Sequence, residues 1–591
     1  MRRPRPDVGR AGPVNGGTRR LAAAISFVLV LVLVGLVMSA GGCAPGEPVS
    51  RGSMTGRGGA EPESRPLPQP ASDINPVPRA RVRDGGTLRR AIDELPAQWN
   101  YHHVRGGTAS LDLILRGLLP YPFRADERGV LHPDRDYVTA AAVTATAPRQ
   151  VVTYTLNPKA RWSGSAPITY RDYAAQAAAL SGRDPRFLIG STGGYRQIAK
   201  VARGVDDFHV VITFARPYAG WRALFAPLYP AAATTGPGAF NHGWTARPVV
   251  TAGPFRMGGI DLTGRSVTIR RDDRWWGRRA KLDAMVFRVF DIAAAPAALA
   301  GGEVDLVDIG ADAAAYRRVR AAPGVVVRKA AGPDWRQLTF NGAGPVLSDV
   351  RVRRALAVGI DRRTIAAAGL RDLGWPGQTL DNHFFMNTQT GYADNSGGLG
   401  RHDPARAGRL LDAAGWRRSG RLRWRAGRAL TLRFVIPAAN PVSRREAVLT
   451  RAMLARIGVR VDIQTVPAGG SFFRHVSTGD FDITAFSWLG SPLPVASARS
   501  VFAKPHPDAV QQNYARVGAD RIDHAMDLAL GELDPARARR HVNAADRLIW
   551  QVMGVLPLYQ RPQLIGADER VANDGARGFR TPAYEDIGFV R

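Results

Sequence analysis

The chain has one cysteine, Cys43, among 591 residues, so it cannot form an intramolecular disulfide. A zinc site built on several thiolates is excluded for the same reason. The fold must therefore rest on a packed hydrophobic core, and a chain of this length can bury one in two to four domains. Hydrophobic residues make up 45% of the chain and charged residues 22%, which is typical of globular rather than disordered proteins.

The surroundings of Cys43 predict export from the cell. Residues 1–20 carry six arginines and one aspartate, and residues 21–40 are apolar and uncharged. This arrangement is typical of a secretory signal, although the apolar run could also cross a bilayer once as a retained helix. Ala40-Gly41-Gly42-Cys43 resembles the lipobox of bacterial lipoproteins, in which the cysteine is acylated; the family usually has Leu where Ala40 stands. The resemblance implies a lipid anchor (palmitate or a similar acyl chain) on Cys43 and a protein on the extracytoplasmic face of the cell membrane.

Residues 44–85 are rich in Gly, Pro, Ser and Arg and show little apolar periodicity. Such a segment buries too little apolar surface to offset the entropy of ordering, so we predict a flexible tether.

The rest of the chain lacks the common sequence signatures of enzymes. None of its five lysines is followed by Ser or Thr, so there is no Walker A loop, and no His-x-x-x-His pair indicates a helical zinc site. No Gly-x-Ser-x-Gly segment is present. A catalytic triad assembled from scattered residues stays open, but the sequence favours binding over catalysis, and it indicates no cofactor and no metal.

Short β-branched and aromatic runs alternate with helical patterns after residue 85. We predict strands at 86–92, 151–156, 210–214, 266–270, 430–436, 459–463 and 482–488, and helices at 168–180, 350–360 and 445–457. Thr169 and Asp349 precede two of these helices as candidate N-caps. Strand–helix–strand units of this length indicate an α/β fold with a parallel sheet.

An ordered series of short segments spans roughly residues 85–590. These segments are 152–172 (VTYTLNPKARWSGSAPITYRD), 252–255 (AGPF), 271–277 (RDDRWWG), 302–306 (GEVDL), 340–341 (FN), 349–362 (DVRVRRAL with the later IDR), 479–488 (GDFDI with Trp488) and 556–559 (LPLY). Together and in this order, they resemble the oligopeptide- and dipeptide-binding lipoproteins of bacterial ABC importers, the solute-binding proteins of family 5.

The resemblance implies a two-lobed periplasmic-binding-protein-like fold, with an additional inserted domain and a hinge between the lobes. The implied parts are a signal peptide with lipobox at 1–43, the tether at 44–85, lobe I at 86–118, 228–333 and 556–591, the inserted domain II at 119–227, and lobe III at 334–555. It also implies partners: a peptide ligand in the cleft between the lobes, the permease subunits of an ABC transporter, and the membrane through the lipid anchor. We expect a monomer.

The resemblance also nominates the residues that line the cleft. In peptide-binding members an Asp follows the matching Trp by three positions and faces the ligand's α-amino group, but Ser491 stands at that position here. Because a charge-assisted hydrogen bond is about twice as strong as a neutral one, this exchange weakens the expectation of a free peptide N-terminus. The full candidate set is Asn100, Tyr101, Trp335, Asn341, His383, Phe384, Trp488, Leu489, Gly490, Ser491 and Asn513.

Three alternatives stay open on the sequence. The first is a non-peptide or modified-peptide ligand on the same fold, and the second is a sensing or chaperone-like binder without transport. The third is an exported hydrolase. The net charge of +31 does not add a nucleic-acid partner, because the arginines are spread along the chain, often beside acids, rather than gathered in one arm or stripe. A bias toward Arg, Ala and Gly is typical of a high-GC genome.

Overall fold

The computed structural model describes residues 69–291, 293–506 and 510–591. The predicted signal, the lipobox with Cys43 and most of the predicted tether therefore lie outside the described residues. Within the described ranges, no helix combines the length and the apolar composition needed to cross a bilayer.

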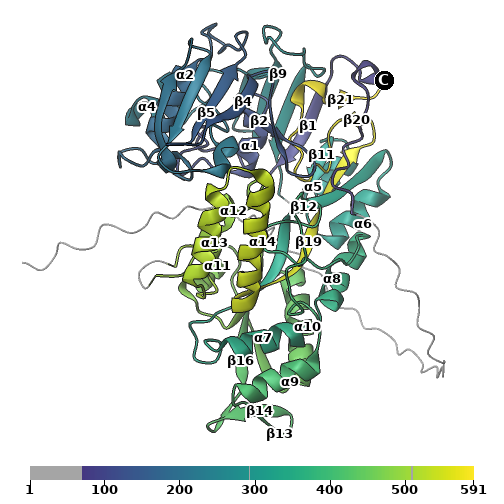
Figure 1. The fold of residues 1–591 in the computed structure, drawn as a ribbon. Helices are drawn as coiled ribbons and strands as arrows, with labels where there is room; N and C mark the ends of the chain where they lie inside the picture. The colour runs from purple at the N-terminus through teal and green to yellow at the C-terminus, as the bar shows by residue number, and fades with distance from the viewer. Residues whose placement is uncertain (1–68, 292, 507–509) are drawn as a thin grey trace, which may run out of the picture.

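A ten-stranded mixed sheet runs through the whole length of the molecule (Figure 1). Its strands, in spatial order, are β17 (Arg460–Val466), β16 (Thr431–Pro437), β18 (Ile483–Leu489), β12 (Val325–Phe340), β19 (Val555–Asp568), β11 (Leu306–Asp308), β1 (Thr87–Ile92), β10 (Ala284–Val289), β9 (Ser266–Arg271) and β8 (Phe255–Asp261). The predicted parallel pairing is present where β16 lies beside β17 and β18, and where β1 lies beside β10 and β11. The central strands β12 and β19 are antiparallel to each other, which the strand–helix–strand reading did not anticipate.

The strands β12 and β19 connect the two ends of the molecule. They pair along most of their length, with register shifts between Ala331 and Trp335 and again at Arg336 (Figure 1). Such irregularities bend a strand and interrupt its hydrogen-bond ladder. The two long strands therefore have the position and the local irregularity of a hinge.

A second sheet forms a separate layer at one end of the molecule, in the blue part of Figure 1. Its antiparallel strands are β4 (Val138–Ala145), β5 (Val151–Leu156), β7 (His209–Phe214) and β6 (Ile198–Arg203). Helix α2 (Tyr170–Leu180) contacts β6 and begins with the predicted Thr169 cap, which forms a reciprocal capping box with Asp172. This layer falls within the range expected for the inserted domain.

The remaining elements are helices and small sheets. The helices are α1 (Ala109–Leu115), α3 (Ala231–Thr234), α4 (Pro237–His242), α5 (Ala295–Ala300), α6 (Ala313–Ala321), α7 (Val350–Gly359), α8 (Arg362–Leu370), α9 (Pro404–Ala413), α10 (Pro441–Arg456), α11 (Gly470–Thr478), α12 (Pro494–Phe502), α13 (Asp520–Gly531) and α14 (Pro535–Val552). The small sheets pair β2 (Phe123–Ala125) with β3 (Leu131–Pro133), β13 (Arg417–Ser419) with β14 (Leu422–Arg425) and β15 (Arg428–Ala429), and β20 (Val571–Ala572) with β21 (Gly588–Phe589).

The body folds around three clusters of buried hydrophobic side chains. One joins the blue end of the molecule to the outer strands β1 and β8–β10, a second surrounds the middle of the long sheet, and a third lies among α11–α14. Among the described residues, the buried members of these clusters fall between Leu88 and Phe589. The described body therefore contains three large buried clusters.

The ordered body begins earlier than the sequence predicted. Residues 69–85 were assigned to a flexible tether, but Asp73 and Val82 form bridges to Ala576 and Val590 near the C-terminus. The main-chain amides of Ala331 and Lys329 also donate to the Pro70 carbonyl and to the Asp73 carboxylate. Pairing with other segments of the chain orders this segment. Apolar periodicity within the segment does not reveal such pairing, so the sequence did not predict its order.

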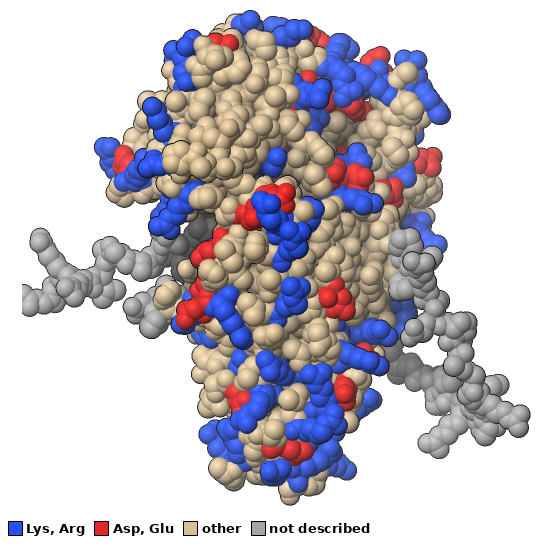
Figure 2. Space-filling view, in the orientation of Figure 1, with Lys and Arg blue, Asp and Glu red and all other residues tan. Residues whose placement is uncertain are grey.

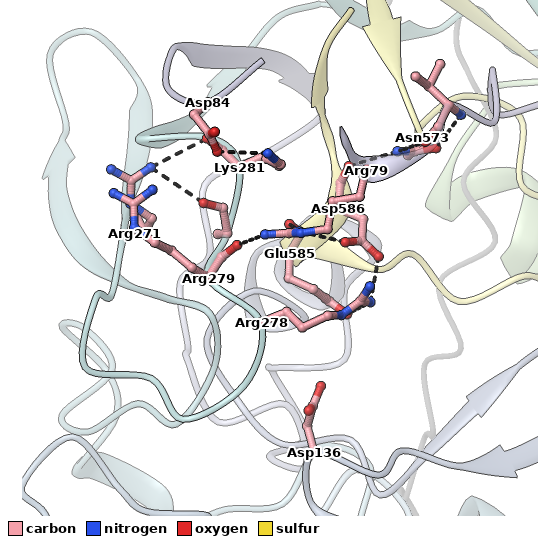
Figure 3. Close-up of polar contacts among 12 residues, drawn as sticks. Arg79, Asp84, Asp136, Arg271, Arg278, Arg279, Lys281, Asn573, Glu585 and Asp586 are labelled. Carbon is pink, nitrogen blue, oxygen red and sulfur yellow. Dashed lines mark hydrogen bonds and ion pairs between the residues drawn. The ribbon is translucent and has the colours of Figure 1, made fainter. Parts of the chain in front are cut away.

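A polar network holds this N-terminal segment against the C-terminal loop (Figure 3). Arg79 forms an ion pair of 2.7 Å with Asp586, which Arg278 also contacts at 2.6 Å. Lys281 pairs with Asp84 at 2.9 Å. Asn573 exchanges hydrogen bonds with the main chain of Val77 at 2.9 and 3.1 Å. The two ends of the described body are thus fixed to each other.

Candidate functional site

Two tryptophans lie side by side where β12 and β18 pair. Trp335 and Trp488 are direct partners in the antiparallel register, and Asp334 is opposite Leu489. The side chains of Trp335 and Trp488 are both buried, while Leu489 is 58% exposed. Beyond the strand, the amide of Gly490 donates to the Pro333 carbonyl at 2.7 Å and keeps the two chains together. Four of the nominated residues thus converge at the end of one strand pair.

Tyr514, which the sequence analysis did not nominate, completes this surface. Its ring stacks on Trp488 with 5.8 Å between centroids and 11° between planes. Phe486 packs on both rings at steep angles. The stack consists of the buried Trp488 and the partly exposed Tyr514, and such aromatic faces accept apolar or planar groups.

Ser491 is engaged in shaping its loop. Its hydroxyl lies 3.0 Å from the Ser497 hydroxyl on α12 and accepts a hydrogen bond of 3.1 Å from the Leu493 amide. The nearby carboxylate of Asp334 is paired with Arg561 at 2.6 Å. The position that the resemblance assigns to an ammonium-binding Asp thus holds a neutral side chain, and the adjacent acid already has a cationic partner.

The β2–β3 hairpin, which comes from a distant part of the chain, lies close to the loop that carries Ser491. The Thr390 amide donates to the Arg128 carbonyl at 3.3 Å, and Gln389 donates from its side chain to the Ser491 carbonyl at 3.0 Å. At Gly129, where φ is +77°, an added Cβ would lie 3.1 Å from the Gln389 amide nitrogen and 3.6 Å from Pro492. Gln389 therefore lies between the hairpin and the Ser491 loop. No motif in the sequence marks it.

The region around Asn100 and Tyr101 lies in the other half of the molecule. The Asn100 amide donates to the Phe240 carbonyl at 2.9 Å, and its oxygen accepts from the His102 amide at 3.1 Å. Tyr101 is half-buried, and burial together with the nearby Asp112 carboxylate raises the pKa of its phenol well above the usual value. Tyr101 thus presents a neutral hydroxyl, whereas the Asn100 side chain is occupied in holding its loop.

The other nominated residues lie in the interior of lobe III. The Asn341 amide donates to the carbonyls of Gly479 and Phe481, and the Asn513 amide donates to those of Ala503 and Val517. Phe384 is 1% exposed and packs on Phe502. Asn513 and Phe502 line a small, mainly apolar cavity between α12, α13 and α14. Phe384 shares a buried cluster with Trp335 and Trp488, and Asn513 directly precedes Tyr514, but the side-chain amides of Asn341 and Asn513 are occupied by main-chain carbonyls.

His383 is buried, and its ring packs on Trp335, Phe502 and Trp550. One ring nitrogen, Nδ1, lies 2.7 Å from the Asp546 carboxylate, and the other, Nε2, lies 3.0 Å from the Val555 carbonyl. The side chains of both His383 and Asp546 are 0% exposed. Both ring nitrogens of His383 face acceptors, so its side chain links α14 to β19 and does not face solvent.

Comparison with known proteins identifies the fold. A family model described as bacterial extracellular solute-binding proteins, family 5, matches residues 138–508. The chain is 40% identical over 524 residues to the oligopeptide-binding protein OppA of Mycobacterium tuberculosis, covering 88% of this chain and 87% of that protein.

Two solved structures share the architecture over most of their length. A periplasmic EDTA-binding protein, EppA, superposes with a TM-score of 0.78 at 24% identity, covering 88% of this chain and 98% of that one. The oligopeptide-binding protein AppA of Bacillus subtilis, solved with a nonapeptide, superposes with a TM-score of 0.67 at 16% identity and covers 86% and 100%. The expected two-lobed fold is thereby confirmed.

Proposed function

Because the chain belongs to the family 5 extracellular solute-binding proteins of bacteria, we propose that it captures oligopeptides between its lobes and delivers them to the permease of an ABC importer. Its similarity to OppA over most of both chains supports this function most strongly. The peptide lies extended in the cleft and is held mainly through its backbone, as an added strand would be. Closure of the lobes around it requires that the peptide bind the closed form more tightly than the open one.

The lobe III wall of the proposed site consists of Trp488 with Tyr514, and of the loop from Leu489 to Ser491. Trp335 supports Trp488 from the neighbouring strand, and Gln389 joins the loop to the opposing hairpin. Tyr101 contributes a neutral hydroxyl from the other half. The remaining nominated residues, Asn100, Asn341, His383, Phe384 and Asn513, hold loops and the interior in place.

This wall gives no acidic partner to a peptide amino group at position 491. We therefore expect the protein to bind a nonapeptide and its N-acetylated form with similar affinity. Ser491→Asp introduces the carboxylate and should favour the free peptide by about tenfold, since a charge-assisted bond contributes about 1.5–3 kcal/mol. Isothermal titration with the two peptides on both proteins measures this. Equal affinities in the Ser491→Asp variant would show that position 491 does not face the amino group, while absence of peptide binding in the wild type would refute peptide capture itself.

We extend this proposal to the location of the protein, on the outer face of the cell membrane. Acylation of Cys43 anchors the chain on the outer face of the cell membrane, and the body acts there as a monomer. Metabolic labelling with a palmitate analogue should mark the wild type and spare Cys43→Ala. If the label persists in the variant, or if the variant stays in the membrane through residues 21–40, a retained helix is the anchor instead.

We further propose that the protein binds its ligand without chemical conversion. A fluorophosphonate probe, which labels reactive serines, should leave the purified protein unmodified. Specific labelling would favour the exported hydrolase. Deletion of the gene should abolish uptake of the bound peptides; intact uptake with loss of a cellular response would favour the sensing role.

A further inference from the structure

A small projecting sheet at the far end of lobe III carries an unusual concentration of arginine. We call residues 417–428, on strands β13, β14 and β15, the basic tip; it lies at the lower end of Figure 1, where Figure 2 shows arginine and lysine side chains close together. Its exposed large side chains are Arg417, Arg418, Arg421, Trp424, Arg425 and Arg428.

The pairing of these strands places like charges directly opposite each other. Arg418 faces Arg423 across β13 and β14, and Arg425 faces Arg428 across β14 and β15. Like-charged side chains in such positions destabilise a sheet. Between residues 401 and 430 the only carboxylates are Asp403 and Asp412. The basic tip therefore carries an unbalanced charge that an anionic partner would stabilise.

The two carboxylates near the tip form hydrogen bonds that stabilise the local structure. Asp403 caps the N-terminus of α9 by accepting a hydrogen bond from the Arg406 amide at 2.7 Å. Asp412 accepts from the buried Arg423 at 2.7 Å, and Arg423 also donates to the carbonyls of Trp416 and Ile457. These hydrogen bonds fix the strands that carry the outer arginines, so the arginines do not lie on a free loop.

Trp424 shares one face of this small sheet with Arg417, while the alternation of side chains along the strands places Arg425 and Arg428 on the other face. It is 41% exposed, and its direct neighbours across the sheet are Arg417 and Ala429. Tryptophan side chains are enriched at the headgroup level of membranes, and the guanidinium fork of arginine binds phosphate through two hydrogen bonds. Basic segments close to a membrane are attracted to anionic lipids. A protein of an extracellular solute-binding family meets such a surface at the membrane of its permease.

We propose that the basic tip binds the anionic phospholipid headgroups of the membrane, with the arginines on phosphate and Trp424 inserted at the headgroup level. This contact is independent of the ligand cleft and of the anchor at Cys43. It holds the lobe III end of the body on the bilayer.

The test uses residues 69–591, which hold all three buried clusters, without the anchor. Cosedimentation with vesicles of phosphatidylglycerol and phosphatidylcholine is compared with vesicles of phosphatidylcholine alone. The body should bind only the anionic vesicles, and binding should weaken with salt. Arg417→Ser, Arg421→Ser and Arg428→Ser combined should reduce partitioning by at least about tenfold. The matched control removes three exposed arginines of α6, Arg317, Arg318 and Arg320, which lie well away from the tip, and should change partitioning less than about threefold.

The fluorescence of Trp424 provides a second readout. Subtracting the emission spectrum of Trp424→Phe from that of the wild type isolates the emission of Trp424. This emission should shift to shorter wavelength on anionic vesicles. The proposal is overturned if the body does not bind anionic vesicles, if the tip and control variants lose binding equally, or if Trp424 emission stays unchanged. Equal losses of vesicle binding in the tip and control variants would indicate attraction by net charge alone. If the tip bound an acidic protein but no anionic vesicles, the surface would belong to a protein partner instead.

Discussion

Trp488 and Tyr514 stack with nearly parallel rings, 5.8 Å apart at their centroids, although 26 positions separate them in the chain. Trp488 is the next-to-last residue of β18, and Tyr514 follows the loop after α12. The pair therefore joins two segments of lobe III into one aromatic surface beside the Ser491 loop.

If this surface binds peptide, removing either ring should weaken binding. We expect Trp488→Ala and Tyr514→Ala each to lower peptide affinity by about tenfold, because truncating an aromatic residue that anchors a ligand costs more than about 1 kcal/mol. Titration calorimetry measures the loss. Trp424→Ala, at the distant end of lobe III, is the matched control and should retain wild-type affinity. An unchanged affinity in both stack variants would remove the aromatic surface from the site.

A buried ion pair secures the other face of the hinge strand β12. Arg336 donates from Nε to Glu446 on α10 at 3.0 Å, and the Tyr559 hydroxyl of β19 donates to the same carboxylate at 3.1 Å. Glu446→Gln leaves the Arg336 charge buried without its partner, so we expect a loss of about 3 kcal/mol in the free energy of unfolding. The double variant Arg336→Met with Glu446→Met should lose less than Glu446→Gln. Denaturant unfolding of the set measures this, and a larger loss in the double variant would contradict it.

Some of these features could be predicted from the sequence, and the reasons are local. The Thr169 and Asp349 caps and the paired strands β5 and β7 follow from neighbouring residues and were predicted, whereas β4 and β6 of the same sheet were not. Trp335 and Trp488 were nominated because each stands in a recognisable motif. Gln389 and Tyr514 have no such motif, and their contacts depend on distant loops. Residues 69–85 likewise become ordered only through the C-terminal segment.

His102 gives the protein a dependence on pH. Burial lowers the pKa of its imidazole to about 4, and its Nε2 atom lies 2.8 Å from the Pro227 carbonyl. Between pH 6.5 and 4 the unfolded chain binds a proton that the folded one does not, so stability falls as the pH decreases through this range. The full shift corresponds to at most about 3 kcal/mol. His102→Gln should flatten the decline; thermal unfolding from pH 4 to 8 measures it, and an equally steep decline in the variant would exclude His102 as the cause.

Asp136 should act in the opposite direction. Burial first, and then the carboxylates of Asp134 and Glu585, raise the pKa of Asp136 to about 6; Figure 3 shows it beneath Arg278. The folded state therefore holds a proton that the unfolded chain releases between pH 4 and 6, and stability falls as the pH rises through this range. The side chain is 28% exposed, so solvent reduces the effect to about 1 kcal/mol.

Asp136→Asn removes this titration. The variant should be more stable than the wild type at pH 7 and equal to it at pH 4, as measured by urea unfolding at both values. Greater stability of the wild type at pH 7 would show that the contact of Asp136 with Arg124, at 3.6 Å, outweighs the repulsion between the carboxylates.

Native mass spectrometry of the exported protein, purified without denaturation, tests peptide capture most directly. We predict adducts of many masses that fragment into peptide sequences, and their loss from the double variant Trp488→Ala with Tyr514→Ala. A single adduct that is not a peptide, or peptides retained equally by the double variant, would contradict peptide capture at this aromatic surface.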